Sequence, residues 1–322
     1  MSERVPPADL STVRTYPLEE RKNKVSVEQF ARPVDPQASV SAFLEGLSGF
    51  LGARVLRDLA CTIVEARERG RPVLLALGAH VVKVGLSPVL IQLLEGGILS
   101  GLVMNGAGAI HDWEIAAIGA TSEDVAAGLH RGRFGMAEET GHELNEAARE
   151  AAERGEGLGE TLGRRIVEQR LPYRDRSLLG RARELGLPAT VHVAIGSDIV
   201  HQHPRADGAA IGASTFTDFR RLVSLVSDLS GGVWINCGSA VQLPEVFLKA
   251  LSVAQNLGHD VTDFATANLD MIRHYRTEEN VLHRPTQGKG RAFALTGHHE
   301  IHVPLLAAAI LAARARRSPG NG

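Results

Sequence analysis

Residues 73–78 read Val-Leu-Leu-Ala-Leu-Gly, and residues 98–108 read Ile-Leu-Ser-Gly-Leu-Val-Met-Asn-Gly-Ala-Gly. Each stretch is a short apolar run that leads into glycine, which is typical of a strand buried on both faces of a sheet. The intervening residues 87–95 have helical character and are followed by Gly96 and Gly97. A strand–helix–strand unit of this kind has a right-handed crossover, so the two strands are parallel and both glycine-bearing ends lie at one edge of the sheet.

The same order of elements recurs along the rest of the chain. Further strands are predicted at 189–194, 232–235, 263–266 and 291–295, and each is followed at once by polar or glycine residues. Helices are predicted around 40–47 and at 54–69, 218–229, 244–257 and 304–316. These elements predict an α/β fold, a doubly wound and mostly parallel sheet with helices on both faces.

The positions of proline-rich and charged stretches predict the domain organisation. Residues 1–38 are polar and contain five prolines, so we expect an extended N-terminal arm. Residues 39–317 form a single α/β domain, in which the charged stretch 122–186 is a helical excursion from the sheet. Residues 318–322 are expected to be a short flexible tail.

Composition excludes several classes of protein. The chain has 35 basic and 37 acidic residues and no long block of like charge, which argues against a nucleic-acid partner. No apolar run approaches the roughly 18 residues of a membrane helix. Cys61 and Cys237 form no metal-ligand or disulfide pattern, which favours a reducing compartment. We therefore expect a cytoplasmic protein that binds a small molecule.

In an open parallel sheet, ligands bind outside the carboxyl ends of the strands. The residues Gly106-Ala107-Gly108 lie at such an end and open a helix, where backbone N–H groups and the helix dipole favour a phosphate. A turn that simply needs glycine is an equally good interpretation. The histidines at 298, 299 and 302 follow the last strand without forming a zinc motif, so hydrogen bonding to a ligand is favoured over a metal site.

Lysine is scarce, because only five of the 35 basic residues are lysines. An imine-forming nucleophile must be an amine whose pKa can fall, which arginine does not provide. Lys83 follows the first strand and Lys289 precedes the last one, so both are candidates for the ligand site. The alternatives are that they pair with phosphates or carboxylates, or that Gly288-Lys289-Gly290 is a mobile surface loop.

The strand ends, read in order, resemble the deoxyhypusine synthase family, including its bacterial homospermidine-synthase-like branch. The resemblance spans about residues 40–315 and depends on residues 78–85, 105–112, 195–198 and 296–306. It implies a Rossmann-like fold, NAD bound at the subunit interfaces of a homotetramer, and transfer of an aminobutyl group of a polyamine through a lysine imine. The arm at 1–38 resembles the family's arm, which covers a neighbouring site.

The resemblance also assigns candidate site residues. Those expected to bind NAD are Ala79, His80, Lys83, Gly106, Ala107, Gly108, Asp198, Thr266, Asn268 and His298. Those expected to bind the amine substrate are His111, Asp112, Asp270 and Glu278, and the three carboxylates among them suit ammonium groups. The candidate catalytic residues are Lys289, His298 and Glu300, and no metal is expected.

The sequence departs from the family at its chemical residues. The family's catalytic lysine follows Trp-Gly, whereas here Gln287-Gly288 precedes Lys289, and the family's final Asp-Ala meets His298-His299. Two functions therefore stand side by side. One is an NAD-dependent transferase acting on a polyamine-like amine. The other is a nucleotide-binding paralogue with a different reaction or none, which uses His298, His299 and Glu300 instead of a lysine imine.

Overall fold

The computed structural model describes residues 5–317, which contain one six-stranded sheet in the order β3-β2-β1-β4-β5-β6. All of its neighbouring strands are parallel. The strands are β1 (Val73–Leu77), β2 (Gly101–Asn105), β3 (Ala189–His192), β4 (Val233–Cys237), β5 (Ala265–Asp270) and β6 (Arg291–Thr296). The predicted doubly wound sheet is confirmed, and it is wholly parallel. Strand order reverses between β1 and β4, which is the topological switch point of a Rossmann-like sheet.

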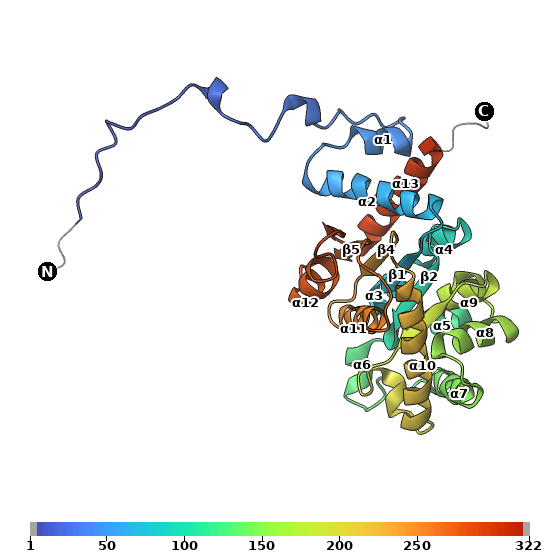
Figure 1. Ribbon diagram of the computed structural model, residues 1–322. Helices are drawn as coiled ribbons and strands as arrows, with labels where there is room; N and C mark the ends of the chain where they lie inside the picture. The colour runs from blue at the N-terminus through green and yellow to red at the C-terminus, as the bar shows by residue number, and fades with distance from the viewer. Residues whose placement is uncertain (1–4, 318–322) are drawn as a thin grey trace.

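Helices cover both faces of this sheet (Figure 1). One face carries α2 (Leu51–Glu68), α4 (Ser87–Glu95) and α13 (His299–Arg317), and the other carries α10 (Gly208–Ser227) and α11 (Gln242–Asn256). Successive residues of β1 point to opposite faces: Leu75 and Leu77 pack with the first group, and Leu74 and Ala76 with the second. The apolar run of β1 therefore contributes to both halves of the core.

Shorter helices lie in the loops at the sheet's edge or beside it. They are α1 (Val40–Gly46), α3 (Ala79–Lys83), α5 (Gly106–Ile118), α12 (Tyr275–Thr277), the 3-10 turn η4 (Ile199–Gln202) and the π-helical segment η5 (Glu278–His283). Both α3 and α5 start directly after a strand, so they carry their first residues at the carboxyl edge.

β5 lies later in the sequence than predicted. Residues 267–270, expected to form a polar loop after a strand at 263–266, are themselves in the strand and buried. The polar side chain of Asn268 is accommodated because the Asn236 amide nitrogen donates to its Oδ1 at 2.7 Å. A buried polar pair inside a sheet does not show as an apolar run, and this is why the sequence pattern places the strand too early.

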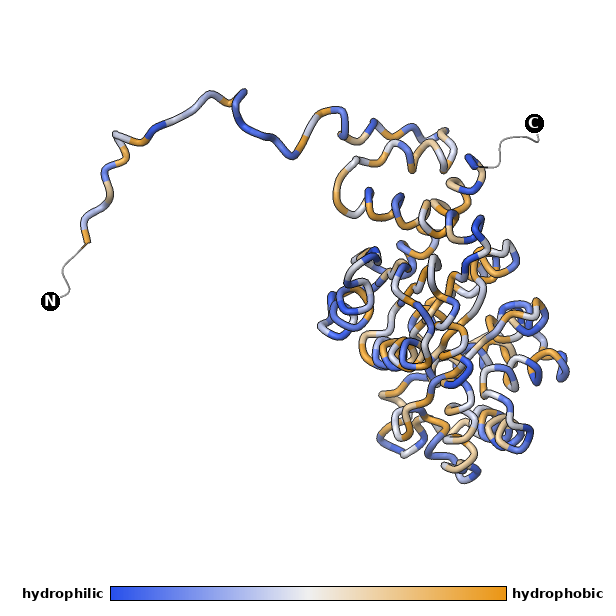
Figure 2. Tube along the Cα trace, in the orientation of Figure 1, coloured by the Kyte–Doolittle hydropathy of each residue, from blue (hydrophilic) through white to orange (hydrophobic). Residues whose placement is uncertain are grey.

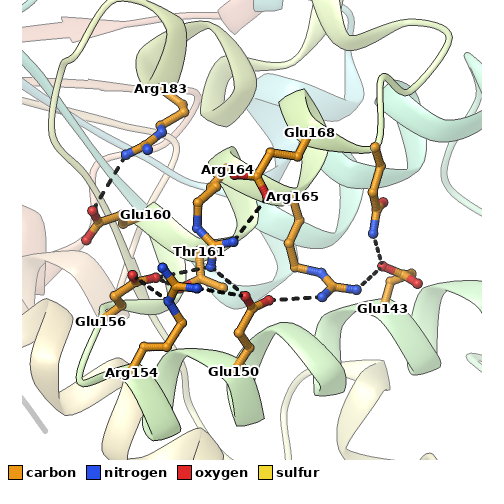
Figure 3. Close-up of polar contacts among 11 residues, drawn as sticks. Glu143, Glu150, Arg154, Glu156, Glu160, Thr161, Arg164, Arg165, Glu168 and Arg183 are labelled. Atoms are coloured by element: carbon orange, nitrogen blue, oxygen red, sulfur yellow. Dashed lines mark hydrogen bonds and ion pairs between the residues drawn. The ribbon is translucent and has the colours of Figure 1, made fainter.

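Residues 122–186 contain α6 (Val125–Leu129), α7 (Glu138–Arg154), α8 (Leu158–Glu168), η3 (Arg174–Arg176) and α9 (Leu178–Glu184). An ion-pair network joins α7 to α8 (Figure 3). Arg164 is 8% exposed and lies 2.8 Å from Glu150 Oε1 and 3.2 Å from Glu156 Oε2. Arg165 lies 2.7 Å from Glu143 Oε2 and 3.0 Å from Glu150 Oε2. Glu150 thus bridges two arginines.

The N-terminal arm extends away from the domain (Figure 1). Residues 5–37 are exposed throughout and contain only two short 3-10 turns, η1 (Leu18–Glu20) and η2 (Val27–Gln29). Its base is attached to the domain by backbone hydrogen bonds, from Arg32 N to Gly46 O at 2.9 Å and from Gly49 N to Gln29 O at 2.7 Å. Apolar residues are interspersed along it (Figure 2). The predicted tail at 318–322 lies outside the described residues, and in residues 5–317 no helix is long and apolar enough to cross a membrane.

Candidate functional site

The loops after β1 and β4 touch at the switch point. The backbone N–H of Gly78 donates to Cys237 O at 2.9 Å. A Cβ added to Gly78 would lie 2.1 Å from Gly238 O, so no other residue fits here without moving the main chain. The two central loops of the carboxyl edge are therefore held together by direct backbone contact, and the side chains beyond them are brought close.

His80, on α3, faces His299, the first residue of α13. Their ring centroids are 5.5 Å apart. His299 is 1% exposed, and its Nε2 lies 3.3 Å from Leu269 O, a contact that requires Nε2 to carry the hydrogen. Its Nδ1 is then an acceptor, and it is buried without a partner in the described residues. This atom is available to a ligand.

The charges around His80 set its protonation state. Burial lowers the pKa of His80 below its ordinary value, and His299 and Lys83 lower it further, while Glu300 and Asp270 act in the opposite direction. His80 is therefore a neutral imidazole at pH 7, which can accept a proton. His80, Lys83, Asp270, His299 and Glu300 thus form one cluster, here called the edge cluster, although they come from three separate loops.

The outer members of the edge cluster are placed differently. Asp270 is 8% exposed, and its Oδ1 accepts from the N–H of Met271 at 2.7 Å. Glu300 and Lys83 are exposed, as is His298, whose Nδ1 lies 3.7 Å from Glu300 Oε1. The cluster therefore has a buried imidazole side and a solvent-facing charged side.

The N-terminus of α5, where the sequence predicts a phosphate, already holds two side chains. Asn105 Oδ1 accepts from Gly108 N at 2.9 Å as the N-cap. Asp198 lies so close that a Cβ on Gly106 would be 2.0 Å from its Oδ2. Burial raises the pKa of Asp198 to about 6, against the effect of a hydrogen bond from the backbone of Ala107. Glycine is therefore needed at position 106 because the Asp198 carboxyl group fills the space that a Cβ would occupy, and this holds with or without a ligand.

Asp112, expected to bind substrate, has a structural role instead. It is 0% exposed, and its carboxylate accepts from Ser177 Oγ at 2.6 Å and from the N–H groups of Leu178 and Leu179 at 2.7 and 3.1 Å. These are the first residues of α9, so Asp112 caps that helix. In the sequence, an aspartate near a glycine-rich loop suggests a ligand contact. The structure shows instead that the carboxylate of Asp112 is used by the start of α9, which is distant in the sequence.

His111 is held beside the site by a local network. Its Nδ1 lies 2.6 Å from Thr121 Oγ1, and that hydroxyl is 2.5 Å from Glu114 Oε2. Thr140 Oγ1, on α7, donates to the other oxygen of Glu114 at 3.0 Å. The predicted substrate role of His111 stays a prediction.

Thr266 and Asn268 do not reach the edge. Thr266 is 0% exposed and is the second residue of β5, four residues before its carboxyl end at Asp270. Asn268 is 3% exposed and bonded to Asn236. The prediction that these two side chains contact NAD depended on a strand that ends too early, and the structure corrects it.

Lys289 lies at the opposite edge of the sheet. It precedes β6, and the next residue, Gly290, would bring a Cβ within 3.0 Å of Phe264 O, just before β5. A strand of six residues rises by about 20 Å, which separates Lys289 from the carboxyl edge. The prediction that Lys289 is near the site within one chain is therefore wrong, because residues before a parallel strand and residues after it lie at different edges.

Glu278 and His302 also lie near the carboxyl edge. Glu278 follows β5 by a short loop, and its Oε1 lies 3.3 Å from Arg273 Nε. His302, which the site prediction omits, packs under Gly297, where a Cβ would lie 2.4 Å from the imidazole ring. Its Nδ1 is buried without a partner in the described residues. The signal for His302 is its spacing of three from His299 on α13, which puts both rings on one helix face.

Two larger features complete the geometry. Among the described residues, no three His, Cys, Asp or Glu side chains are placed to hold a metal ion. Two cavities, of about 430 and 370 Å³, open at the amino ends of the strands, away from the edge cluster. These two cavities therefore lie at the end of the strands opposite to the edge cluster.

Comparison with known proteins finds similarity in structure. The chain aligns with a protein assigned as LOR/SDH from Methanococcus maripaludis S2 at a TM-score of 0.51 and 14% identity, over 92% of this chain and 76% of that one. It aligns with ArgZ, an arginine dihydrolase from cyanobacteria, at 0.50 and 13%, over 82% of this chain and 33% of that one. The likeness is one of fold. The chain spans only about a third of the length of ArgZ.

A protein assigned as a deoxyhypusine synthase from Entamoeba histolytica also aligns, at a TM-score of 0.48 and 11% identity, over 88% of this chain and 96% of that one. That score is too low to support membership of the family. No family model matches the sequence, and no curated protein is detectably similar to it. The Rossmann-like fold is shown, and the function must be argued from the site.

Proposed function

We propose that this protein is an NAD-dependent enzyme that oxidises an amine at the edge cluster. The observation that carries this proposal is the imidazole pair of His80 and the buried His299, flanked by Asp270, Glu300 and Lys83, beside the switch point of a 3-2-1-4-5-6 sheet. In such sheets the dinucleotide binds across the point at which strand order reverses. A neutral imidazole next to carboxylates suits removal of a proton from an ammonium group that those carboxylates bind.

The residues present fit NAD at this edge. His299 Nδ1, His302 Nδ1 and Asp198 Oδ2 are buried polar atoms without partners in the described residues, and a polar ligand would satisfy them. Lys83 supplies an exposed cation for a pyrophosphate. Asp198, whose pKa burial raises to about 6, is mostly ionised at pH 7 and therefore suits a hydroxyl donor of the dinucleotide and not its phosphates. NAD, when bound, accepts a hydride from the carbon next to the substrate nitrogen.

The chain's own residues account for the rest of the reaction. Asp270, which ends β5, Glu278, which begins η5, and Glu300, in the first turn of α13, bind the ammonium groups of a polyamine-like substrate. His80 takes the proton that leaves the substrate nitrogen as its carbon loses the hydride, so an imine forms without any covalent bond to the protein.

Transfer of the resulting group to a lysine requires more than one chain. Lys289 lies about 20 Å from the carboxyl edge of its own sheet. A transferase that uses Lys289 would need the amino edge of a second subunit to face this site, in a homotetramer like that implied by the resemblance. The placement of Lys289 favours the second candidate, a paralogue that uses the histidines and Glu300 instead of a lysine imine.

Binding and turnover test this proposal separately. We expect NAD to bind in isothermal titration calorimetry, and absorbance at 340 nm to rise when spermidine is added as the probe amine. His80→Gln should leave the NAD affinity within about threefold and lower the rate of NADH formation by about 100-fold, the usual contribution of a general base. His259→Gln is the matched control, since His259 is exposed and lies before β5 at the amino edge.

Each outcome has one meaning. Binding without NADH formation for spermidine, putrescine and agmatine would reduce the protein to a nucleotide-binding paralogue. Absence of NAD binding would remove the cofactor and the proposal with it. Full activity in His80→Gln would place the proton acceptor elsewhere.

A further inference from the structure

A polar cavity of about 370 Å³ opens at the amino edge of the sheet, on the side away from the edge cluster. Its wall comes from α2, from the residues that precede β1, β4 and β5, and from the first residues of β5 and β6. The charged side chains that line it are Arg69, Arg71, Asp263 and Arg291, and Thr62 and Ser230 contribute hydroxyl groups. Three cations, two from the segment between α2 and β1 and one from the start of β6, therefore meet one carboxylate, for a formal lining charge of +2.

These three arginines are not neutralised by the rest of the chain. Within residues 5–317, the side chains of Arg69, Arg71 and Arg291 make no ion pair and no hydrogen bond. In contrast, the arginines of α8, Arg164 and Arg165, are each paired with at least two glutamates. Like charges gathered at one concavity repel each other, so an arrangement of this kind is expected where an anion completes it.

Two of these arginines, although exposed, have side chains close to neighbouring residues. The stem of Arg71 packs on Gly231, where a Cβ would lie 3.2 Å from Arg71 Cγ. The φ of Gly231 is +74°, so glycine is favoured there on both counts. The guanidinium of Arg291 lies 5.9 Å from the ring centre of Phe293. Ordering these side chains in advance lowers the entropy that a ligand must remove when it binds.

We propose that this cavity binds a diphosphate group, either free or carried by a nucleotide. Arginine's planar donors match phosphate oxygens in pairs, and three guanidinium groups around one cavity suit an anion with several charged oxygens. The lining offers no aromatic face for a base, because Phe264 is 3% exposed, so the phosphates are the recognised part. The site is independent of the edge cluster, which lies at the other end of the same strands.

Calorimetry with sodium pyrophosphate at constant ionic strength tests this site. We expect saturable one-to-one binding, and we expect Arg71→Ala and Arg291→Ala each to weaken it tenfold or more, the effect of losing a charge-assisted hydrogen bond. Asp263→Asn should tighten binding, because it removes the one negative charge of the lining while its backbone O still accepts from Gly231 N. Arg220→Ala, which removes an exposed arginine of α10, is the matched control and should leave the affinity unchanged.

A second arm distinguishes the sources of the diphosphate. Equal affinity for ADP and pyrophosphate means that the free diphosphate is sufficient, and tighter binding of ADP means that the nucleoside contributes. Pyrophosphate binding that survives both arginine variants would overturn the assignment to this cavity. Circular dichroism and thermal unfolding of each variant verify that the fold is intact.

Discussion

Single buried aspartates connect distant segments of this chain. Asp112 caps α9, Asp198 lies at the start of α5, and Asp218 accepts from Gly159 N at 2.8 Å and Val191 N at 2.9 Å. The last of these connects α8 to β3 through α10. Burial raises the pKa to about 6 for Asp112 and about 7 for Asp218, in each case against the effect of the hydrogen bonds. The hydrogen bonds thus only partly offset the loss of hydration.

Asp218 makes stability depend on pH in a direction that can be tested. Because the folded-state pKa of about 7 exceeds the ordinary 3.8, the folded protein holds this proton more tightly, and stability falls as pH rises from about 4 to 7. The amide side chain of the variant Asp218→Asn cannot ionise. The free energy of unfolding of Asp218→Asn minus that of the wild type should therefore increase by up to about 4 kcal/mol as pH rises across that range. Urea unfolding at pH 4.5, 6.0 and 7.5 measures this difference.

The matched control is Asp228→Asn, at the exposed end of α10, which should follow the wild-type pH profile. A constant difference in stability between Asp218→Asn and the wild type at all three pH values would show that the carboxyl group of Asp218 does not titrate in this range.

At the scale of elements, the helical excursion is stabilised by charge. The network between α7 and α8 has Arg164 at its centre (Figure 3). Burial opposes ionisation of Glu150, but hydrogen bonds from Arg165 and Arg164 hold the pKa of Glu150 below its ordinary value. A cluster whose central charges each have two partners orders its side chains at lower cost per pair than an isolated surface pair does.

Removing Arg164 should therefore destabilise the excursion. We expect Arg164→Ala to lower the free energy of unfolding by about 3 kcal/mol at pH 7, because half-buried glutamates lose their main partner. The loss should shrink as pH falls below 4.5, where the glutamates become protonated and no longer need a cation. Hydrogen exchange of the amides in α7 and α8 measures the local effect.

Arg183→Ala is the comparison, since Arg183 is 45% exposed and lies 3.7 Å from Glu160. An exposed pair of this kind contributes less than about 1 kcal/mol. Equal losses for the two variants would show that the network adds nothing beyond its separate pairs.

At the scale of the whole molecule, the N-terminal arm has apolar side chains that the described part of the chain does not cover. Val13, Tyr16, Leu18 and Phe30 are each more than half exposed on it. An extended segment with apolar side chains and no core of its own becomes ordered by lying on another surface, and a second copy of this chain is the partner we propose.

Deleting residues 1–36 should therefore weaken assembly. Sedimentation equilibrium of the full chain at micromolar concentration is expected to give about four times the mass of one chain, and the truncated chain should dissociate at least partly. Tyr16→Ser together with Phe30→Ser should act in the same direction with the arm still present. A monomeric full chain, or an assembly that the deletion leaves unchanged, would contradict a role for the arm.

The sequence by itself determined the elements whose pattern is local. The apolar run 73–77 with Gly78, and the run through Met104 with Gly106, identify β1 and β2 because strands buried on both faces are continuously apolar. The recurrence of that pattern was enough to predict the parallel sheet. It also placed His80, Lys83 and Glu300 at the carboxyl edge, since the residues directly after a parallel strand lie there.

Only the tertiary structure decided the features that depend on distant partners. β5 extends to Asp270 because the Asn236 amide donates a hydrogen bond to the buried Asn268 side chain. Asp112 is not available to a substrate because its carboxylate caps α9, more than 60 residues later in the sequence. The edge at which Lys289 lies, and the meeting of Arg71 with Arg291, result from strand order. The physical reason is the same in each case. The role of a polar side chain depends on the groups that surround it in the folded chain, and those groups are distant in the sequence.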